Sequence, residues 1–300
     1  MKKKLVFFLI LFAFLAVSLN SGSAGEYSYT KGGNDIKFSL SVPDGWTVDD
    51  SGKTRTPLVL IGPTDRTTIN INVVMEKMPQ WYRIDEETIE KVKGKIPDNS
   101  LESIKSIAWF KLDDKNIDTF KDKLGNEKVE KVKRIQHIVY SKEDLIGRLE
   151  ELGFQKEELD LIVNNIKTLT KVVFTEKELT TKLKGLKFKQ NDINTYLAVA
   201  RVTDITPEEY AFRAFSYRTD LVKDIRVLSD KKITIQGIDT YQAVVDYTFN
   251  LPSNLVLTRA LQTCIFNKGY AYIITGSALT DNFEKYENTF KGVTESLKFQ

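Results

Sequence analysis

The sequence contains a single cysteine and a single histidine, and each scarcity excludes a kind of chemistry. Cys264 has no partner for an internal disulfide, so packing must stabilise the fold, and its place in a predicted strand favours a small buried side chain. His137 alone excludes any site that needs two histidines, and as the base of a hydrolytic triad it lacks an identifiable nucleophile. The sequence also has no Gly-x-Ser-x-Gly elbow, phosphate loop or dinucleotide glycine pattern. It therefore indicates no catalytic set and no cofactor.

The chain also lacks a surplus of charge of either sign. It has 44 Lys and Arg against 41 Asp and Glu, and three of the lysines, Lys2 to Lys4, belong to a segment that we expect to be removed. The remaining 44 − 3 = 41 basic residues balance the 41 acidic ones. Nucleic-acid binding needs excess Lys and Arg to displace counterions from phosphates. A nucleic-acid partner is therefore not expected.

Long apolar runs are absent except at the N-terminus. Lys2 to Lys4, an apolar run over residues 5–19 and small residues up to Ala24 form the three regions of a secretory signal peptide. We predict that residues 1–24 are cleaved off, which indicates a secreted, periplasmic or cell-surface protein. The alternative is an uncleaved N-terminal anchor, although an apolar run of about fifteen residues is short for a membrane span. After cleavage no membrane span is expected.

The last third of the chain reads as strands closed by a helix. Residues 233–248 alternate between apolar and polar side chains, the period of a half-buried strand. Residues 256–266 and 270–277 form two more strands, joined by a tight hairpin at Asn267-Lys268-Gly269. Asp281 and Glu284 resemble a capping box, and the residues after them have apolar side chains at helical spacing. This stripe consists of Phe283, Tyr286, Phe290, Val293 and Leu297.

The first part of the chain reads as a meander of short strands. Alternating patterns predict strands at residues 27–30, 36–42, 56–61 and 67–75. Trp46 follows the Pro43-Asp44-Gly45 turn, and we interpret it as a hydrophobic plug at the end of the sheet in preference to a ligand platform.

Two groups of residues resemble the PsbP/DcrB-like superfamily. Ile36 to Trp46 is similar to its first strand and the Pro-x-Gly-Trp turn that follows. The second group lies near the other end of the chain and consists of Gly237 to Ala243, Asn267 to Thr275, Phe283 to Tyr286 and Ser296 to Phe299. The resemblance covers about half of the chain and implies an α+β fold, an antiparallel β-sheet flanked by helices in an α/β/α sandwich. The matched residues are turn glycines and packing positions, so they concern fold rather than activity.

In the family, a helix follows the first strands and precedes the second group of residues. In this sequence the matching helix lies far downstream of the first strands. Thr206-Pro207-Glu208-Glu209 predicts a capped helix start, followed by an apolar stripe up to Leu221. We therefore expect a discontinuous domain, built from residues 25–79 and 204–300, whose two parts share one sheet. Residues 80–203 are then an inserted, mainly helical domain.

The insert contains an internal repeat with an offset of 34 residues. Ile138 to Leu145 aligns with Val172 to Leu179, and apolar positions continue to match beyond them. Each copy predicts a capped helix, a break and a second helix, hence two helical hairpins. The Trp, Gly and Tyr positions of tetratricopeptide repeats are absent. Phe120, which precedes Phe154 by the same offset, is the main sign of an earlier copy within residues 80–128.

One stretch of the insert has the spacing of calcium ligands. Asp114, Asn116 and Asp118 are placed like the first ligands of a calcium loop, and calcium binding is a property of the photosynthetic PsbP branch of the family. However, Thr119 stands where the loop needs Gly, and Gly125 where it needs Glu. The pattern favours the start of a helix, and we predict no metal site.

Two classes of function remain from the sequence. The first is an exported, non-catalytic factor that binds a protein partner of the cell envelope or extracellular space, with the insert as the recognition element. The adjacent pairs Trp81-Tyr82 and Trp109-Phe110 are candidate partner-binding residues, because neighbours in sequence cannot all face one core; burial of both rings is the alternative. The second class is a carboxylate- or metal-dependent hydrolase, which should have paired carboxylates with raised pKa values in one pocket.

Overall fold

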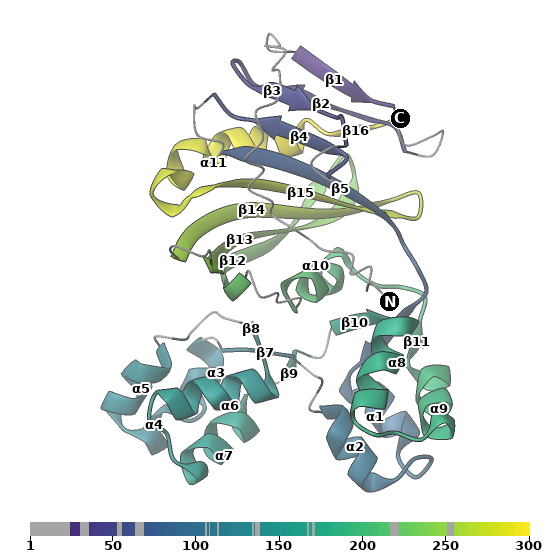
Figure 1. Ribbon diagram of the computed structural model, residues 1–300, viewed down its shortest axis with the longest axis vertical. Coiled ribbons are helices and arrows are strands. Elements are labelled where there is room, and N and C mark those ends of the chain that lie inside the picture. The colour runs from purple at the N-terminus through teal and green to yellow at the C-terminus, as the bar shows by residue number, and fades with distance from the viewer. Residues whose placement is uncertain are drawn as a thin grey trace. The chain divides into compact units, whose positions relative to one another are not determined.

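The computed structural model describes residues 25–30, 36–52, 56–63, 69–105, 107, 109–112, 114–133, 135, 139–166, 168–169, 172–216, 222–250 and 255–300. The predicted signal peptide 1–24 and His137 lie outside this set. The chain divides into two units, one comprising Met1–Met78 with Tyr217–Gln300 and the other Pro79–Ser216 (Figure 1). Antiparallel sheets and helices occur together, which confirms the α+β class.

The first unit is built on a seven-stranded antiparallel sheet. Two of its hairpins close through turns in which both residues have positive φ, Gln236-Gly237 and Lys268-Gly269. Such turns match the twist of the strands that they join. The order across the sheet is β12 (Val222–Ile235), β13 (Ile238–Asn250), β14 (Leu255–Asn267), β15 (Tyr270–Leu279), β5 (Asn70–Lys77), β4 (Leu58–Ile61) and β3 (Thr47–Asp49).

One face of this sheet is covered by the helix α11 (Thr280–Glu295) and by a small second sheet. The predicted stripe of α11 faces this core, since Phe283, Phe290 and Val293 are all buried. Trp46 is buried there too, edge-on to Phe290 at a centroid distance of 6.4 Å, which agrees with the plug interpretation. The second sheet has the order β1 (Gly25–Tyr29), β2 (Phe38–Val42) and β16 (Lys298–Phe299).

Two expectations for this unit were wrong in detail. The strand predicted at 36–42 forms β2, which pairs with β1 and β16 instead of joining the large sheet, although β4 and β5 do join it. As part of the second sheet, β2 adds Phe38 and Leu40 to the core between the large sheet and α11. If β2 extended the large sheet instead, this core would be smaller. The predicted capping box is also absent: the N-cap is Leu279, and Asp281 lies inside the first turn.

The second unit repeats one motif, a strand followed by helices (Figure 1). The described residues contain four copies of this motif, and the first two begin within residues 80–128, where the sequence was hardest to interpret. The first two are β6 (Trp81–Ile84), α1 (Glu86–Val92) and α2 (Asp98–Lys105), then β7 (Trp109–Lys111), α3 (Asp114–Asp118), α4 (Lys121–Leu124) and α5 (Asn126–Lys133). The third is β8 (Val139–Ser141), α6 (Lys142–Glu151) and α7 (Lys156–Asn165), and the fourth β10 (Val172–Thr175), α8 (Glu176–Gly185) and α9 (Gln190–Ala200).

The last two copies follow the 34-residue offset through both helices. Apolar positions that align in the sequence are buried in both copies, as in the pairs Leu149 and Leu183, and Phe154 and Phe188. Thr175 and Glu178 form the predicted capping box, with bonds of 2.8 and 3.3 Å. The stretch with calcium-like spacing is the helix α3, as the helix interpretation predicts.

Strands from different copies pair with each other in two three-stranded sheets. The first has the order β10-β6-β11, where β11 is Arg201–Val202, and the second β8-β7-β9, where β9 is Thr168–Leu169. The first and fourth copies therefore share one sheet, and the second and third share the other. Phe120 and Phe154 lie in the core of the second pair.

The helix α10 (Pro207–Ser216) lies in the second unit, which corrects the predicted boundary at 203/204. Its capping box is the predicted one: the Thr206 amide donates to Glu209 over 2.8 Å, and the Glu209 amide donates to the Thr206 hydroxyl over 3.2 Å. Within this unit the helix packs on β10 and β8. Local caps define where a helix begins but not which sheet it covers.

Glu158 holds the start of α7 and links it to α5. Its carboxylate accepts a hydrogen bond from the Gln155 amide at 2.9 Å and forms an ion pair with Lys128. Both contacts lower the pKa of Glu158 below its ordinary value, and the hydrogen bond from the Gln155 amide has the larger effect. A carboxylate whose pKa is lowered by folding stabilises the protein above its unfolded pKa, and this stabilisation is lost as the pH falls through the folded value.

We therefore expect Glu158→Ala to lower the free energy of unfolding by about 1 kcal/mol at pH 7 and by less at about pH 3. Urea unfolding at both pH values measures this difference. Glu157→Ala is the control, since Glu157 is an exposed neighbour on the same turn and should change stability by less than about 0.5 kcal/mol. An equal cost of Glu158→Ala at the two pH values would contradict the assignment.

Candidate functional site

The candidate residues Trp81 and Tyr82 lie on β6, the central strand of the β10-β6-β11 sheet. Their exposed fractions are only 3% and 7%, so both rings of this pair are buried, as the alternative interpretation of the pair predicts. Neighbours on a strand point to opposite faces, and here both faces are covered. Trp81 packs edge-on against Tyr210 of α10 at 5.6 Å, and Tyr82 donates to Glu176 of α8 over 3.1 Å. Burial and this bond raise the pKa of Tyr82.

The second candidate pair, Trp109 and Phe110, lies on β7. This strand is the centre of the β8-β7-β9 sheet, in which Trp109 pairs with Ser141 and Leu169 and Phe110 with Tyr140 and Thr168. The side chains of Trp109 and Phe110 lie outside the described part of the structure. Their role in partner binding stays a prediction.

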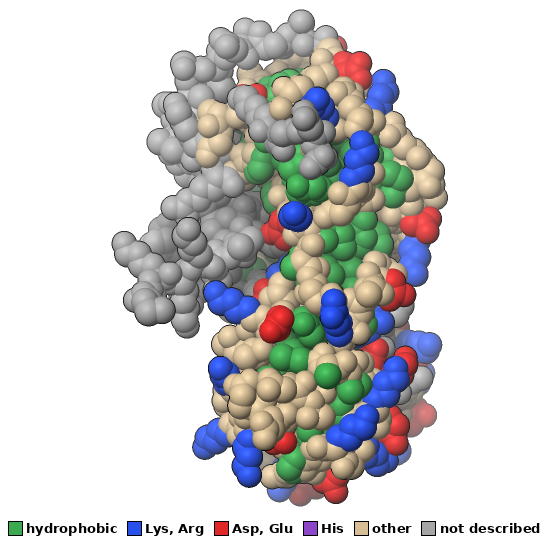
Figure 2. Space-filling model, turned by 90° about the vertical axis from the view of Figure 1, so that its right-hand side faces the viewer, with side chains coloured by type: hydrophobic (Ala, Val, Ile, Leu, Met, Phe, Trp, Pro, Cys, Tyr) green, Lys and Arg blue, Asp and Glu red, His purple; other side chains and the backbone are tan. Residues whose placement is uncertain are grey.

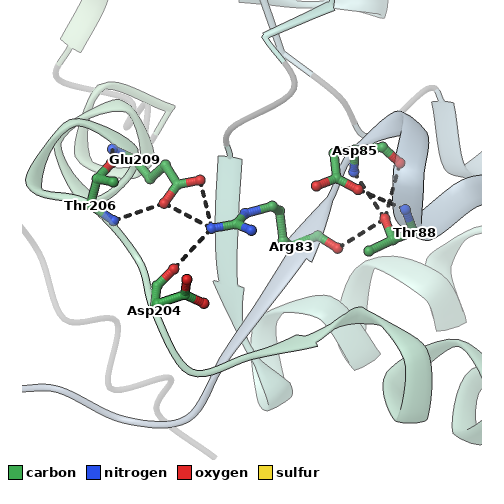
Figure 3. Close-up of polar contacts among 6 residues, drawn as sticks. All are labelled: Arg83, Asp85, Thr88, Asp204, Thr206 and Glu209. Carbon is green, nitrogen blue, oxygen red and sulfur yellow. Dashed lines mark hydrogen bonds and ion pairs between the residues drawn. The ribbon is translucent and has the colours of Figure 1, made fainter.

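Arg83 is the centre of a polar cluster that joins three elements of the second unit (Figure 3). Its Nη2 lies 2.8 and 3.0 Å from the two carboxylate oxygens of Glu209 and donates to the Asp204 carbonyl over 3.0 Å. Its own carbonyl accepts a bond of 3.4 Å from Thr88. Thr88 in turn forms the capping box of α1 with Asp85. Arg83 thus connects β6 to the starts of α10 and α1.

Arg213 forms a second link between α10 and the same sheet. Its guanidinium lies 5.0 Å from the ring centroid of Trp81 and 5.7 Å from that of Tyr210, and its Nη2 donates to Glu178 of α8 over 2.8 Å. Cations over aromatic faces are stabilised most where water is excluded, and Arg213 is buried. The indole nitrogen of Trp81 and Nε of Arg83 are buried without a hydrogen-bond partner.

These clusters are suited to holding helices in place and not to proton transfer. Glu209 and Glu178 are each paired with an arginine, Glu209 with Arg83 and Glu178 with Arg213, so each pair joins two elements of the unit. In the described part of the chain, hydrogen bonds lower the pKa values of Glu26, Glu87 and Glu158. Among the described residues no group of three or more His, Cys, Asp or Glu could hold a metal ion.

The outer face of α9 is the clearest candidate for a binding surface. Its exposed side chains carry no charge, whereas the equivalent positions of α7, one repeat earlier, carry three charged residues and one asparagine. Figure 2 views the side on which α9 lies in Figure 1, and its lower part shows a mainly tan area bordered by charged side chains. The exposed residues are Gln190, Asn191, Asn194 and Ala198 in α9, and Lys156, Glu157, Asp160 and Asn164 in α7.

The apolar positions of the repeat, on which the 34-residue offset rests, do not show this difference. The signal was present in the exposed positions, where Glu157 aligns with Asn191 and Asp160 with Asn194 at the same offset. Depletion of charge is typical of the centre of protein interfaces. Since the two hairpins have the same fold, the change from charged to neutral positions is not required by the packing of the helix.

No family profile matches this chain, and no curated protein sequence matches it. Among solved structures, it is similar to the solution structure of cyanobacterial PsbP (CyanoP) from Synechocystis sp. PCC 6803, with 11% identity and a TM-score of 0.36, over 95% of this chain and 98% of that one. None of the helices in the described residues is long and apolar enough to cross a membrane.

Proposed function

We propose that this protein is an exported, non-catalytic accessory or assembly factor of the cell envelope or extracellular space, and a divergent member of the PsbP/DcrB-like superfamily. In this proposal the protein binds another protein through the second unit. Export rests on the signal-peptide pattern of residues 1–24. The superfamily assignment rests on the residues around Trp46 and on the strands and helix of the last third.

The binding proposal rests on the outer face of α9, where the four exposed side chains are uncharged and the one charged residue of the helix, Asp192, is only partly exposed. The chain as a whole is rich in charge, with 28% Asp, Glu, Lys and Arg. The Gln190 amide donates to Asn194 over 2.9 Å, which holds two of the face's side chains in one arrangement. A pre-arranged neutral surface loses little conformational entropy and little hydration of charges when a partner covers it. The clusters around Arg83 and Arg213 support this surface, because they hold in place the β6 strand against which α9 packs.

The test exchanges the charges of the two equivalent helices. The partner is first identified by affinity purification from the native host, and its affinity is then measured with purified protein. Asn191→Glu with Asn194→Asp introduces the α7 charges into α9 and is expected to weaken binding by at least about tenfold, because the charges would lose water in the interface.

The matched control is the reverse exchange in α7, Glu157→Asn with Asp160→Asn. It should leave the affinity unchanged, and both variants should keep the stability of the wild type, since all four positions are exposed. Equal affinities of the two variants for the partner would overturn the assignment of α9. If no protein copurifies, the binding function itself is contradicted.

A further inference from the structure

On the first unit, the strand β14 continues past the hydrophobic core. Alternate residues of a strand share one face, and along β14 the residues on the α11 face are Leu261, Arg259, Leu257 and Leu255. Leu261 is 2% exposed and belongs to the core, but Leu257 is 45% and Leu255 57% exposed. These two leucines are the exposed large hydrophobic residues of the described chain, and they are adjacent on one face.

Arg259 marks the point at which the core ends. Its guanidinium donates to Asp246 of β13 over 2.7 and 3.1 Å and lies 5.9 Å from the ring centroid of Phe283. The charge of Arg259 is therefore compensated by Asp246. The leucines beyond it add nothing to the core of this unit, so their exposure is not a by-product of packing.

The first turns of α11 lie beside the leucines and carry negative charge. The Thr280 hydroxyl donates to the Leu257 carbonyl over 3.2 Å, which places the start of α11 next to β14. Asp281 and Glu284 follow, both exposed. Glu284 acts electrostatically on Arg259: together with the larger effect of the Asp246 hydrogen bond, it raises the pKa of Arg259. In contrast, residues 247–258 contain no charged side chain.

We propose that Leu255, Leu257 and the acidic start of α11 form a second docking surface, which binds an apolar segment of a protein partner flanked by lysine or arginine. The leucines would bury the apolar part, and Asp281 and Glu284 would attract the flanking cations. The same acidic residues would repel an anionic lipid surface, so the charge favours a basic protein segment over a membrane. This surface lies in the other unit from α9 and does not depend on the role of α9.

The test uses two fluorescein-labelled peptides with the same apolar centre of leucine and phenylalanine, one with lysines at both ends and the other with glutamates. Fluorescence anisotropy with the purified protein should give an affinity at least about tenfold higher for the lysine peptide. Leu255→Thr with Leu257→Thr should weaken this binding by about tenfold or more, since the apolar area is lost while the strand is kept. Both side chains are exposed, so this variant should unfold at the wild-type temperature.

A charge variant separates the acidic turn from the leucines. Asp281→Asn with Glu284→Gln should bring the affinities of the two peptides close to each other. Glu295→Gln, at the exposed far end of the same helix, is the matched control and should change neither. The proposal is overturned if the lysine peptide does not bind at about 1 mM, or if it binds the leucine variant equally well. It is also overturned if the leucines instead mediate binding to phosphatidylserine vesicles or self-association in sedimentation experiments.

Discussion

Replacing Gly276 with alanine is expected to lower the free energy of unfolding of the first unit by about 3 kcal/mol. Gly276 lies on β15, directly beneath Phe290 of α11, and a Cβ at this position would lie 2.4 Å from Cγ and 2.7 Å from Cβ of Phe290. Close-packed interiors cannot absorb such an overlap without moving the helix or the strand. The effect can be followed by the fluorescence of Trp46, whose ring contacts Phe290, during denaturant unfolding.

Two further variants test the cause of this effect. Gly292→Ala, in α11 itself, adds a Cβ that meets no atom within 4 Å, so it should be neutral or stabilise by up to about 1 kcal/mol. Phe290→Ala removes the atoms in conflict. Gly276→Ala should therefore cost much less in the Phe290→Ala background than in the wild type, and the two changes should not be additive. Additive losses, or equal effects at Gly276 and Gly292, would contradict the close approach.

Replacing Arg83 with methionine is expected to destabilise the second unit by about 3 kcal/mol or more. The change leaves the Glu209 carboxylate, whose side chain is 5% exposed, without its cation. Glu209 keeps the hydrogen bond from the Thr206 amide, but one bond does not replace hydration. Methionine also removes the buried, unpartnered Nε of Arg83, so the loss reports the isolated Glu209 charge. Hydrogen exchange of the amides of α10, measured by mass spectrometry, detects the effect in this unit specifically.

The double variant Arg83→Met with Glu209→Gln should recover part of the loss, because a neutral amide costs less to bury than an unpaired charge. The control for removal of an arginine is Arg148→Met, whose partner Glu151 is 68% exposed. Such surface pairs contribute less than about 1 kcal/mol. If Arg83→Met and Arg148→Met have similar effects, the cluster in Figure 3 does not hold α10 in place.

Most of the helices and strands, and the faces that they bury, can be predicted from local sequence patterns. The stripe of α11, the plug at Trp46 and the two helical hairpins all follow from patterns that span a few turns or strands. Such patterns are readable because side-chain direction repeats every 2 residues in a strand and every 3.6 in a helix. The 34-residue offset strengthens the helix predictions, because the same pattern occurs in two copies. Equivalent positions, such as Leu149 and Leu183, are buried in both copies.

Which elements share a sheet or a unit depends on contacts between distant parts of the chain, which local patterns do not predict. The capping box at Thr206 located the start of α10 correctly. However, Arg83, which binds Glu209 of this helix, is 126 residues away in the sequence. Both rings of the Trp81-Tyr82 pair are buried because β6 is covered on both faces, and β14 exposes Leu255 and Leu257 because the core stops at Arg259. Periodicity tells which face of an element is apolar, but the element that covers this face comes from distant parts of the chain. The fold therefore sets these contacts through packing that no local pattern records.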